Sequence, residues 1–171
     1  LLLLMVSATF TGMIITSFED ALAAYVVLTA FIPMLMDTGG NSGSQASVTV
    51  IRSLSLGEVG FSDLFAVLWK ELRVALFCGV TLAAANFVKM MLFDRLVLGN
   101  TGITPVVALV ISLTLICTVV CAKAVGCTLP LLAKKLGFDP AVMASPFITT
   151  IVDAISLLIY FQFAKLFLHL A

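Results

Sequence analysis

Two groups of oxygen-bearing side chains interrupt an otherwise apolar sequence. In the first, within the stretch FIPMLMDTGGNSGSQASVTVIRS (31–53), Asn41, Gln45 and Thr49 recur every four residues after Asp37. A helix places residues four apart on one face, so these side chains would form a polar stripe. Carboxylate, amide and hydroxyl oxygens are hard ligands that suit Mg²⁺, Ca²⁺ or Mn²⁺. The alternative is that the amides only form hydrogen bonds between helices.

The second group lies in the stretch ASPFITTIVDAISLLIYFQF (144–163), whose only acid is Asp153. Helical spacing places five polar residues on one stripe: Ser145, Thr149, Asp153, Ser156 and Tyr160. A carboxylate at membrane depth is costly and by default marks a pathway or a site. The alternative is a neutral Asp153 that is hydrogen-bonded between helices.

The ligand types favour one cation. Mg²⁺ gives up its waters reluctantly and usually keeps several of them. A polar lining with many amides and hydroxyls but few acids therefore suits hydrated Mg²⁺ better than a dehydrated Ca²⁺. The four cysteines lie in apolar stretches without a C-x-x-C pair, so we interpret them as small buried hydrophobes. We predict neither a catalytic site nor a bound cofactor.

The composition places these residues in a membrane. Of the 171 residues, 62% are hydrophobic and 11% are charged, whereas soluble domains have roughly 45–50% and about 25%. The predicted fold class is an all-α integral membrane protein in contact with lipid. A net charge of zero excludes a basic footprint for nucleic acid. Five segments are candidate membrane helices, at about 1–17, 21–53, 62–93, 104–132 and 140–168.

Several helix ends can be predicted. Thr104-Pro105 and Asp139-Pro140 are typical helix starts, with a capping side chain before a proline. The second segment is too long for one straight span, because residues 20–56 would extend about 55 Å as a helix against a hydrocarbon core of about 30 Å. We therefore expect this helix to be broken or kinked at the GGN motif. Its Gly39, Gly43 and Ser47 form a small-residue face for close helix contact.

The third segment and the orientation leave alternatives open. Residues 61–73 mix charged and apolar side chains, which suits either an interfacial helix or the start of one long tilted helix. Basic residues favour a cytoplasmic N-terminus and an outside C-terminus, since Arg52, Lys70, Arg73, Lys134 and Lys135 would lie inside. We expect a multi-pass protein of the plasma membrane. The apolar start at Leu1, without a Met, leads us to expect either an excised membrane domain or a sequence whose leading residues are missing.

One copy of such a chain would seldom enclose a pore. A homodimer would bring the second and fifth segments of both copies around a two-fold axis and would pair the two copies of Asp153.

The motifs resemble a known family. The GGNSGSQAS run after Pro33, the RSLSLGEV run and the SPFITTIVDAISLLIYF run are similar to the transmembrane domain of the MgtE family of magnesium channels and transporters, over essentially the whole chain. The resemblance implies five transmembrane helices per subunit and a dimeric pore, lined by helices two and five, that selects hydrated Mg²⁺. Cytosolic regulatory domains, which usually precede the first helix in this family, are not in this sequence, which we expect to be one transmembrane ion-conducting domain (1–171).

The resemblance also assigns residues. Asp153 would be the central pore carboxylate, Asn41 would line the inner part of the pore, and Ser145 and Thr149 would lie on the helix-five face. Asp37 replaces a small or neutral residue of many relatives, so it would either add a cation site or cap a helix. Some relatives are proposed to exchange Mg²⁺ for Na⁺, which leaves a Na⁺-coupled exchanger as an alternative.

Two rival classes fit less well. An intramembrane aspartyl protease would use a pair such as Asp37 and Asp153 as a close dyad, but its Gly-Asp signature is absent. A membrane adaptor without transport would carry no ion flux.

Overall fold

The chain folds into a bundle of helices. The computed structural model describes the backbone of residues 2–169 and the side chains of residues 5–141 and 146–169. The helices are α1 (Leu2–Ser17), α2 (Glu19–Ala24), α3 (Ile32–Ser55), α4 (Leu64–Lys89), α5 (Pro105–Lys135) and α6 (Pro140–Leu168). A 3-10 segment (Val26–Phe31) precedes α3, a short 3-10 turn (Phe61–Asp63) precedes α4, and a π-helical segment (Met90–Val97) follows α4. No strand occurs among residues 2–169, so the all-α prediction is confirmed.

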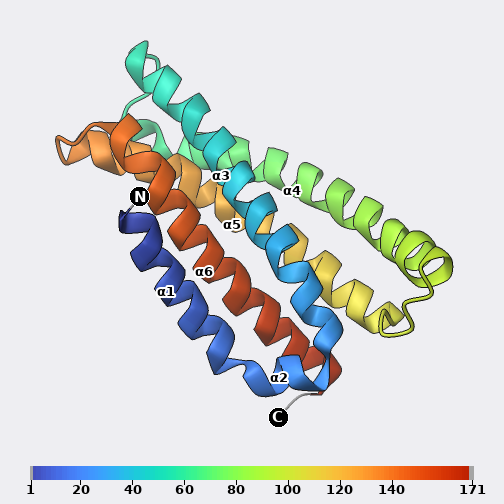
Figure 1. Cartoon of the computed structure of the whole chain (residues 1–171). Helices are drawn as coiled ribbons and strands as arrows, with labels where there is room; N and C mark the ends of the chain where they lie inside the picture. Colours follow the sequence, from blue (N-terminus) through green and yellow to red (C-terminus); the bar gives the residue numbers. More distant parts are fainter. Residues whose placement is uncertain (1, 170–171) are drawn as a thin grey trace.

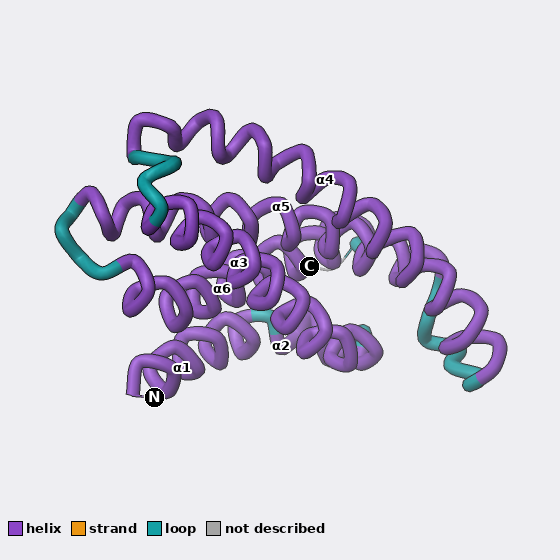
Figure 2. The backbone as a smooth tube through the Cα atoms, turned by 90° about the horizontal axis from the view of Figure 1, so that it is seen from above, coloured by secondary structure: helices purple, strands orange, loops and turns teal. Residues whose placement is uncertain are grey.

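Helix α5 is the centre of the bundle. It packs against α3, α4 and α6, while α1 packs mainly on α6. Viewed from above, α4 and α1 lie on opposite sides with the other long helices between them (Figure 2). The start of α1 and the loops before α4 and α6 lie at one end of the bundle, and the end of α6 lies at the other (Figure 1).

In the part of the chain that the structure describes, three helical segments are long and apolar enough to cross a membrane: Phe61–Val97, Pro105–Lys135 and Pro146–Leu168. The apolar part of α1, Met5–Ser17, is shorter. Helix α3 is not among these three segments, because it contains many polar residues. Its length of 24 residues is nevertheless enough for a span. The predicted number of five spans therefore stays a prediction.

Both predicted helix starts are confirmed. The backbone N–H of Val107 donates to Oγ1 of Thr104 at 3.2 Å, and that of Ala141 donates to Oδ1 of Asp139 at 2.9 Å. In each case a proline follows the cap at the first helical position, where its missing N–H costs no hydrogen bond.

Of the predicted break or kink at the GGN motif, the break is wrong, and the kink stays a prediction. Helix α3 runs unbroken through Gly39, Gly40 and Gly43, and the change of backbone geometry lies earlier, in the 3-10 segment. Glycine weakens an isolated helix, but these glycines are buried, and tertiary packing contributes most of the stability of a helix. Within the 3-10 segment, the buried carbonyl of Leu28 accepts a hydrogen bond of 2.9 Å from the hydroxyl of Tyr160, which gives the irregular backbone a partner.

The third predicted segment is one helix over most of its length. Residues 64–73 continue into the rest of α4 without interruption. The interfacial position of residues 61–73 stays a prediction. Exposed apolar side chains extend along α4 as far as the π-helical segment, including Phe65, Phe77 and Val80. A surface of this kind is suited to lipid.

The glycines of α3 and α5 bring the helix backbones together. A methyl group added to Gly43 would lie 2.7 Å from Cγ2 of Ile148 and 3.1 Å from the carbonyl oxygen of Ala122. A methyl group added to Gly126 would collide with the carbonyl oxygen of Gly43. The predicted close helix contact of the small-residue face is therefore confirmed, and its partners are α5 and α6 of the same chain.

This packing predicts opposite effects of one substitution at two glycines. Gly126→Ala should destabilise the protein by about 1–3 kcal/mol, because the obstacle is backbone and the helices must move apart. Gly12→Ala should be neutral or stabilising by up to about 1 kcal/mol, because a methyl group there meets nothing within 4 Å and alanine favours the helix. Thermal unfolding of both variants in detergent measures the difference. Equal melting temperatures would contradict the close contact.

The hydrogen bond to the 3-10 segment predicts a second effect. Tyr160→Phe should destabilise the protein by about 1 kcal/mol, because the buried carbonyl of Leu28 loses its side-chain donor. Tyr25→Phe is the matched control, since Tyr25 is the other tyrosine of the chain and is only half-buried. If the same unfolding assay gave the two variants one melting temperature, the hydroxyl of Tyr160 would not support the segment.

Candidate functional site

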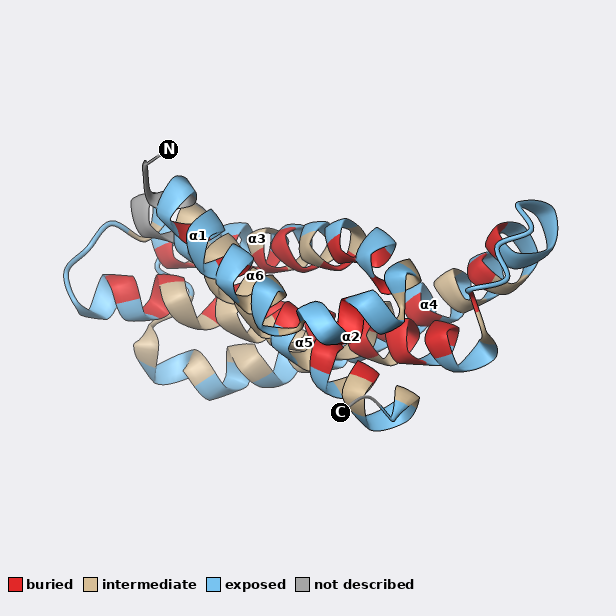
Figure 3. Ribbon diagram, turned by 60° about the horizontal axis from the view of Figure 1, so that its bottom comes forward, coloured by how far each residue is buried: buried red, intermediate tan, exposed pale blue. Residues whose placement is uncertain are grey.

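Helix α3 has two chemically different faces. Its buried face carries Gly39, Gly43 and Ser47, as their spacing predicted. The opposite face exposes the polar side chains of Asp37, Asn41, Gln45 and Thr49. Buried and exposed positions alternate along the helix (Figure 3). The polar stripe predicted from the sequence is thus on the surface of the single chain, and the amides make no hydrogen bond between helices among the described residues.

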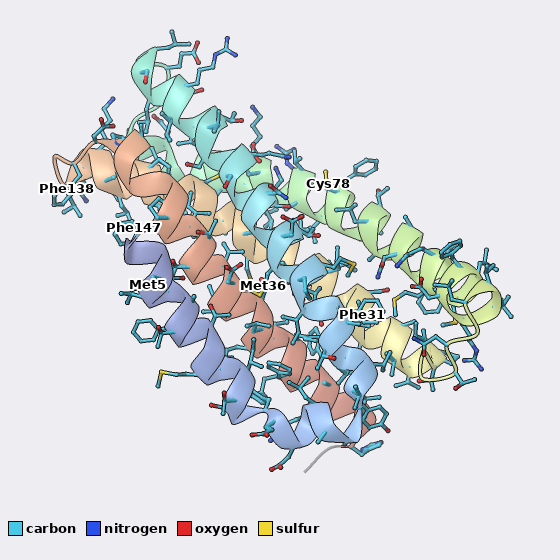
Figure 4. All side chains as sticks on the ribbon, viewed as in Figure 1. Met5, Phe31, Met36, Cys78, Phe138 and Phe147 are labelled. Carbon is cyan, nitrogen blue, oxygen red and sulfur yellow. The ribbon has the colours of Figure 1, made fainter. Side chains whose placement is uncertain are left out.

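The exposed face of α3 forms one wall of a groove of about 590 Å³ between α3 and α4. The α3 wall consists of Asp37, Thr38, Asn41, Ser42 and Gln45. The α4 wall consists of Val74, Phe77, Cys78, Thr81 and Leu82, and Figure 4 shows Cys78 in place on α4. The groove exists because α3 and α4 each pack on α5, whereas direct contact between the two is slight in the described chain.

An ion pair lies at the α5 side of this groove. Nζ of Lys123, a groove-lining residue of α5, lies 3.0 Å from Oε2 of Glu71 on α4. The two side chains are only 11% and 13% exposed. The sequence analysis did not predict this pair. A lone base in the apolar segment was the available signal, but the sequence cannot supply a partner 52 residues away.

Helix α6 presents only part of the predicted polar stripe. Asp153 and Thr149 are half-buried, and the hydroxyl of Thr149 donates to the carbonyl of Pro146 at 3.2 Å. Ser156 and Tyr160 are fully buried, because this side of α6 faces α3 and the 3-10 segment. The polar stripe is therefore covered at its C-terminal end within the single chain. The side chain of Ser145 lies outside the described residues.

The packing of α6 on α3 fixes the level of Asp153. Methyl groups added to Gly43 and Gly39 would each lie 2.7 Å from α6, at Ile148 and Val152 respectively. The two helices therefore run antiparallel: four residues further along α6, the contact lies four residues earlier on α3. Asp153 follows Val152, so it lies level with the turn of α3 that precedes Gly39.

That turn carries Asp37, so both predicted acids lie at one level of the bundle. Asp37 is exposed and Asp153 half-buried. Among the described residues, no group of three or more His, Cys, Asp and Glu side chains is placed to hold a metal ion. Asp37 lines the groove between α3 and α4, whereas Asp153 of α6 is not among the residues that line it, so the groove of the single chain contains only one of the two acids.

The sequence of this region matches a known family. The model of the MgtE family, described as a divalent cation transporter, matches residues 32–163, well over half of the chain. The chain belongs to the MgtE family. Its resemblance to that family is thereby confirmed, and the match includes α3 and nearly all of α6. MgtE proteins are transporters rather than enzymes, which agrees with the expectation that the chain has no catalytic site.

Three relatives match almost all of the chain. It is 36% identical to the magnesium transporter MgtE of Thermus thermophilus and 33% identical to that of Bacillus subtilis, each over 99% of the chain and 36% of the relative. It is 30% identical to the magnesium transporter MgtE of Enterococcus faecalis, over 93% of the chain and 33% of the relative. The chain thus spans about a third of the length of the curated relatives it matches.

The exposed stripe of α3 yields a test of its environment. In a variant whose four native cysteines are replaced by alanine, Asn41→Cys should react with a membrane-impermeant thiol reagent at least roughly tenfold faster than Leu35→Cys, because the reactive thiolate needs water. Leu35 is fully buried on the same helix. Val80→Cys on α4, exposed but away from the groove, should react as slowly as the buried control. Fast labelling at Val80→Cys, or slow labelling at Asn41→Cys, would contradict a water-facing stripe.

Proposed function

We propose that this chain forms the membrane pathway of a magnesium transporter, and that hydrated Mg²⁺ passes along the polar face of α3 between two copies of the chain. One observation carries the proposal: α3 exposes Asp37, Asn41 and Gln45, whereas the neighbouring α4 exposes many large apolar side chains, such as Phe65, Phe77 and Val80. Polar and charged groups are expensive in hydrocarbon and usually face water or protein. A water-filled pathway satisfies this requirement.

The chemistry of the polar face suits a hydrated divalent cation. Amide oxygens of Asn41 and Gln45 can accept hydrogen bonds from the water shell of Mg²⁺, which holds its inner waters tightly. Asp153 would supply the central negative charge, with Thr149 and Ser145 on the same helix and Asp37 at the same level. Mn²⁺ and Ca²⁺ share the preference for oxygen ligands, so they are candidates for weaker transport.

The second copy is part of the proposal. The exposed face of α3 covers only one side of a pathway, and a two-fold axis beside it would supply the other side and a second copy of Asp153. Each chain would then cross the membrane five times. Its N-terminus would be in the cytoplasm and its C-terminus outside the plasma membrane. The relatives support this assignment of substrate, because all three are named magnesium transporters.

The test is the substitution of the central carboxylate. Asp153→Asn should reduce Mg²⁺ uptake into proteoliposomes by about tenfold or more, because it removes one charge from each copy at a site of low dielectric. Asp153→Glu should retain part of the uptake, since the charge remains and only the geometry changes. Asp20→Asn, which alters an exposed acid on α2, is the matched control and should transport normally.

Three outcomes of the same assay would contradict the proposal or refine it. Normal uptake by Asp153→Asn, with a dimer that elutes as the wild type, would remove Asp153 from the pathway. Uptake that strictly requires an opposing Na⁺ gradient would identify a coupled exchanger instead of a channel. Absence of uptake by the wild type under every gradient would leave a membrane domain without transport.

A further inference from the structure

Helices α3 and α6 face each other along a second row of residues beside the close glycine contacts. A methyl group added to Gly40 would lie 3.5 Å from Cγ2 of Thr149, so these two residues are neighbours across the interface. Met36 precedes Gly40 by one turn of α3, and Asp153 follows Thr149 by one turn of α6. Because the two helices run antiparallel, this register brings Met36 and Asp153 to the same level between them.

Met36 is directed toward α6. It shares a helix face with Gly40, four residues later, and Figure 4 shows Met36 between the ribbons of α3 and α6. Its side chain is half-buried and packs against the main apolar cluster, which includes Leu157 and Tyr160 of α6. The α3 side chain that faces α6 at the level of Asp153 is thus a thioether, not an oxygen ligand.

Asp153 has no partner of opposite charge in the single chain. Among the described residues, its carboxylate forms no ion pair and no hydrogen bond. The acid of the same α3 turn, Asp37, lies about 100° around the helix from Met36 and lines the groove beside α4. Within the interface of α3 and α6, the carboxylate of Asp153 is therefore bordered on its α3 side by Met36.

A carboxylate with an apolar neighbour acts differently on Mg²⁺ and Ca²⁺. Mg²⁺ keeps its inner waters, so it needs only acceptors for the hydrogen bonds of those waters. Ca²⁺ takes about six to eight oxygen ligands and gives up its waters for them. A thioether is a soft ligand that suits neither ion. Beside Met36, Asp153 can therefore hold the water shell of Mg²⁺, but it lacks the further oxygens that would bind Ca²⁺ directly.

We propose that Met36 is a specificity-determining residue of the pathway, which keeps oxygen ligands away from Asp153 and thereby favours hydrated Mg²⁺ over directly bound Ca²⁺. The inference rests on the proposed function, since it assumes that the cation passes Asp153 beside α3 and α6. In a two-fold dimer, each copy would contribute one Met36 and one Asp153. The unbranched methionine side chain has three rotatable bonds, so it can move aside as a hydrated ion passes.

A role in packing alone makes a different prediction. Methionine often fills irregular gaps in a core, and a packing defect at Met36 would lower the amount of folded protein or the uptake of Mg²⁺. It would not change the Ca²⁺ concentration that halves Mg²⁺ uptake, because that concentration does not depend on how much protein is active. A specificity role changes this concentration.

The experiment measures Mg²⁺ uptake into proteoliposomes by the intact protein over a series of Ca²⁺ concentrations. Met36→Gln should lower the Ca²⁺ concentration that halves Mg²⁺ uptake by about fivefold or more, because the amide gives each copy an oxygen that can replace a water of Ca²⁺. Met36→Leu should keep this concentration within about twofold of the wild type, because it retains an apolar side chain of similar volume.

Met91→Gln is the matched control. Met91 lies in the π-helical segment that follows α4, and like Met36 it is half-buried and packs against the main apolar cluster. The same substitution there should leave the sensitivity to Ca²⁺ unchanged. If Met36→Gln does not fold, Met36→Thr also brings an oxygen to this level and should shift the sensitivity in the same direction, by less.

The outcomes separate this inference from the proposed function. Unchanged sensitivity to Ca²⁺ in Met36→Gln and Met36→Thr would overturn the specificity role, and so would an equal shift in Met91→Gln. In both cases Mg²⁺ uptake by the wild type would leave the proposed function standing. A wild type without Mg²⁺ uptake would overturn both.

Discussion

The close approach of α3 to α5 and α6 is the constraint on which the rest of the structure depends. Gly43 and Gly126 allow the backbones of α3 and α5 to touch, and Gly39 allows α6 to lie against the same face. In a membrane, helix association relies on such close packing because lipid removes the usual hydrophobic drive. Once this face of α3 is buried, the helical period leaves Asn41 and Gln45 exposed on the opposite side.

The faces of α3 could be predicted because helix geometry alone relates them. Small residues four apart must share a side, and the amides that lie about 200° around the helix must point away from it. The starts of α5 and α6 were predictable for the same reason, since capping by Thr104 and Asp139 is a local interaction. The family resemblance rested on the same residues of α3 together with those of α6.

The features that could not be predicted depend on contacts between distant segments. The helix break was expected at GGN because glycine is a weak helix former, whereas packing holds those glycines in a helix and the 3-10 segment is supported by Tyr160 from far along the chain. The stripe of α6 followed the helical period, but the period does not say which neighbour covers Ser156. The pairing of Lys123 with Glu71 likewise exists only once α4 and α5 are side by side.

The packing of the glycine face of α3 on α5 and α6 therefore explains both why this face is buried and why the amide face is exposed. The buried glycine face packs on α5 and α6 of the same chain, so the amide face is left to line the groove beside α4 and makes no hydrogen bond to another helix among the described residues. Hydrocarbon cannot satisfy amides and carboxylates, and a face that is polar over several turns needs water, an ion or a second chain beside it. The packing that stabilises the single chain thus also leaves a polar face that one chain cannot cover. This is why we place the proposed pathway beside that face, between two copies of the chain.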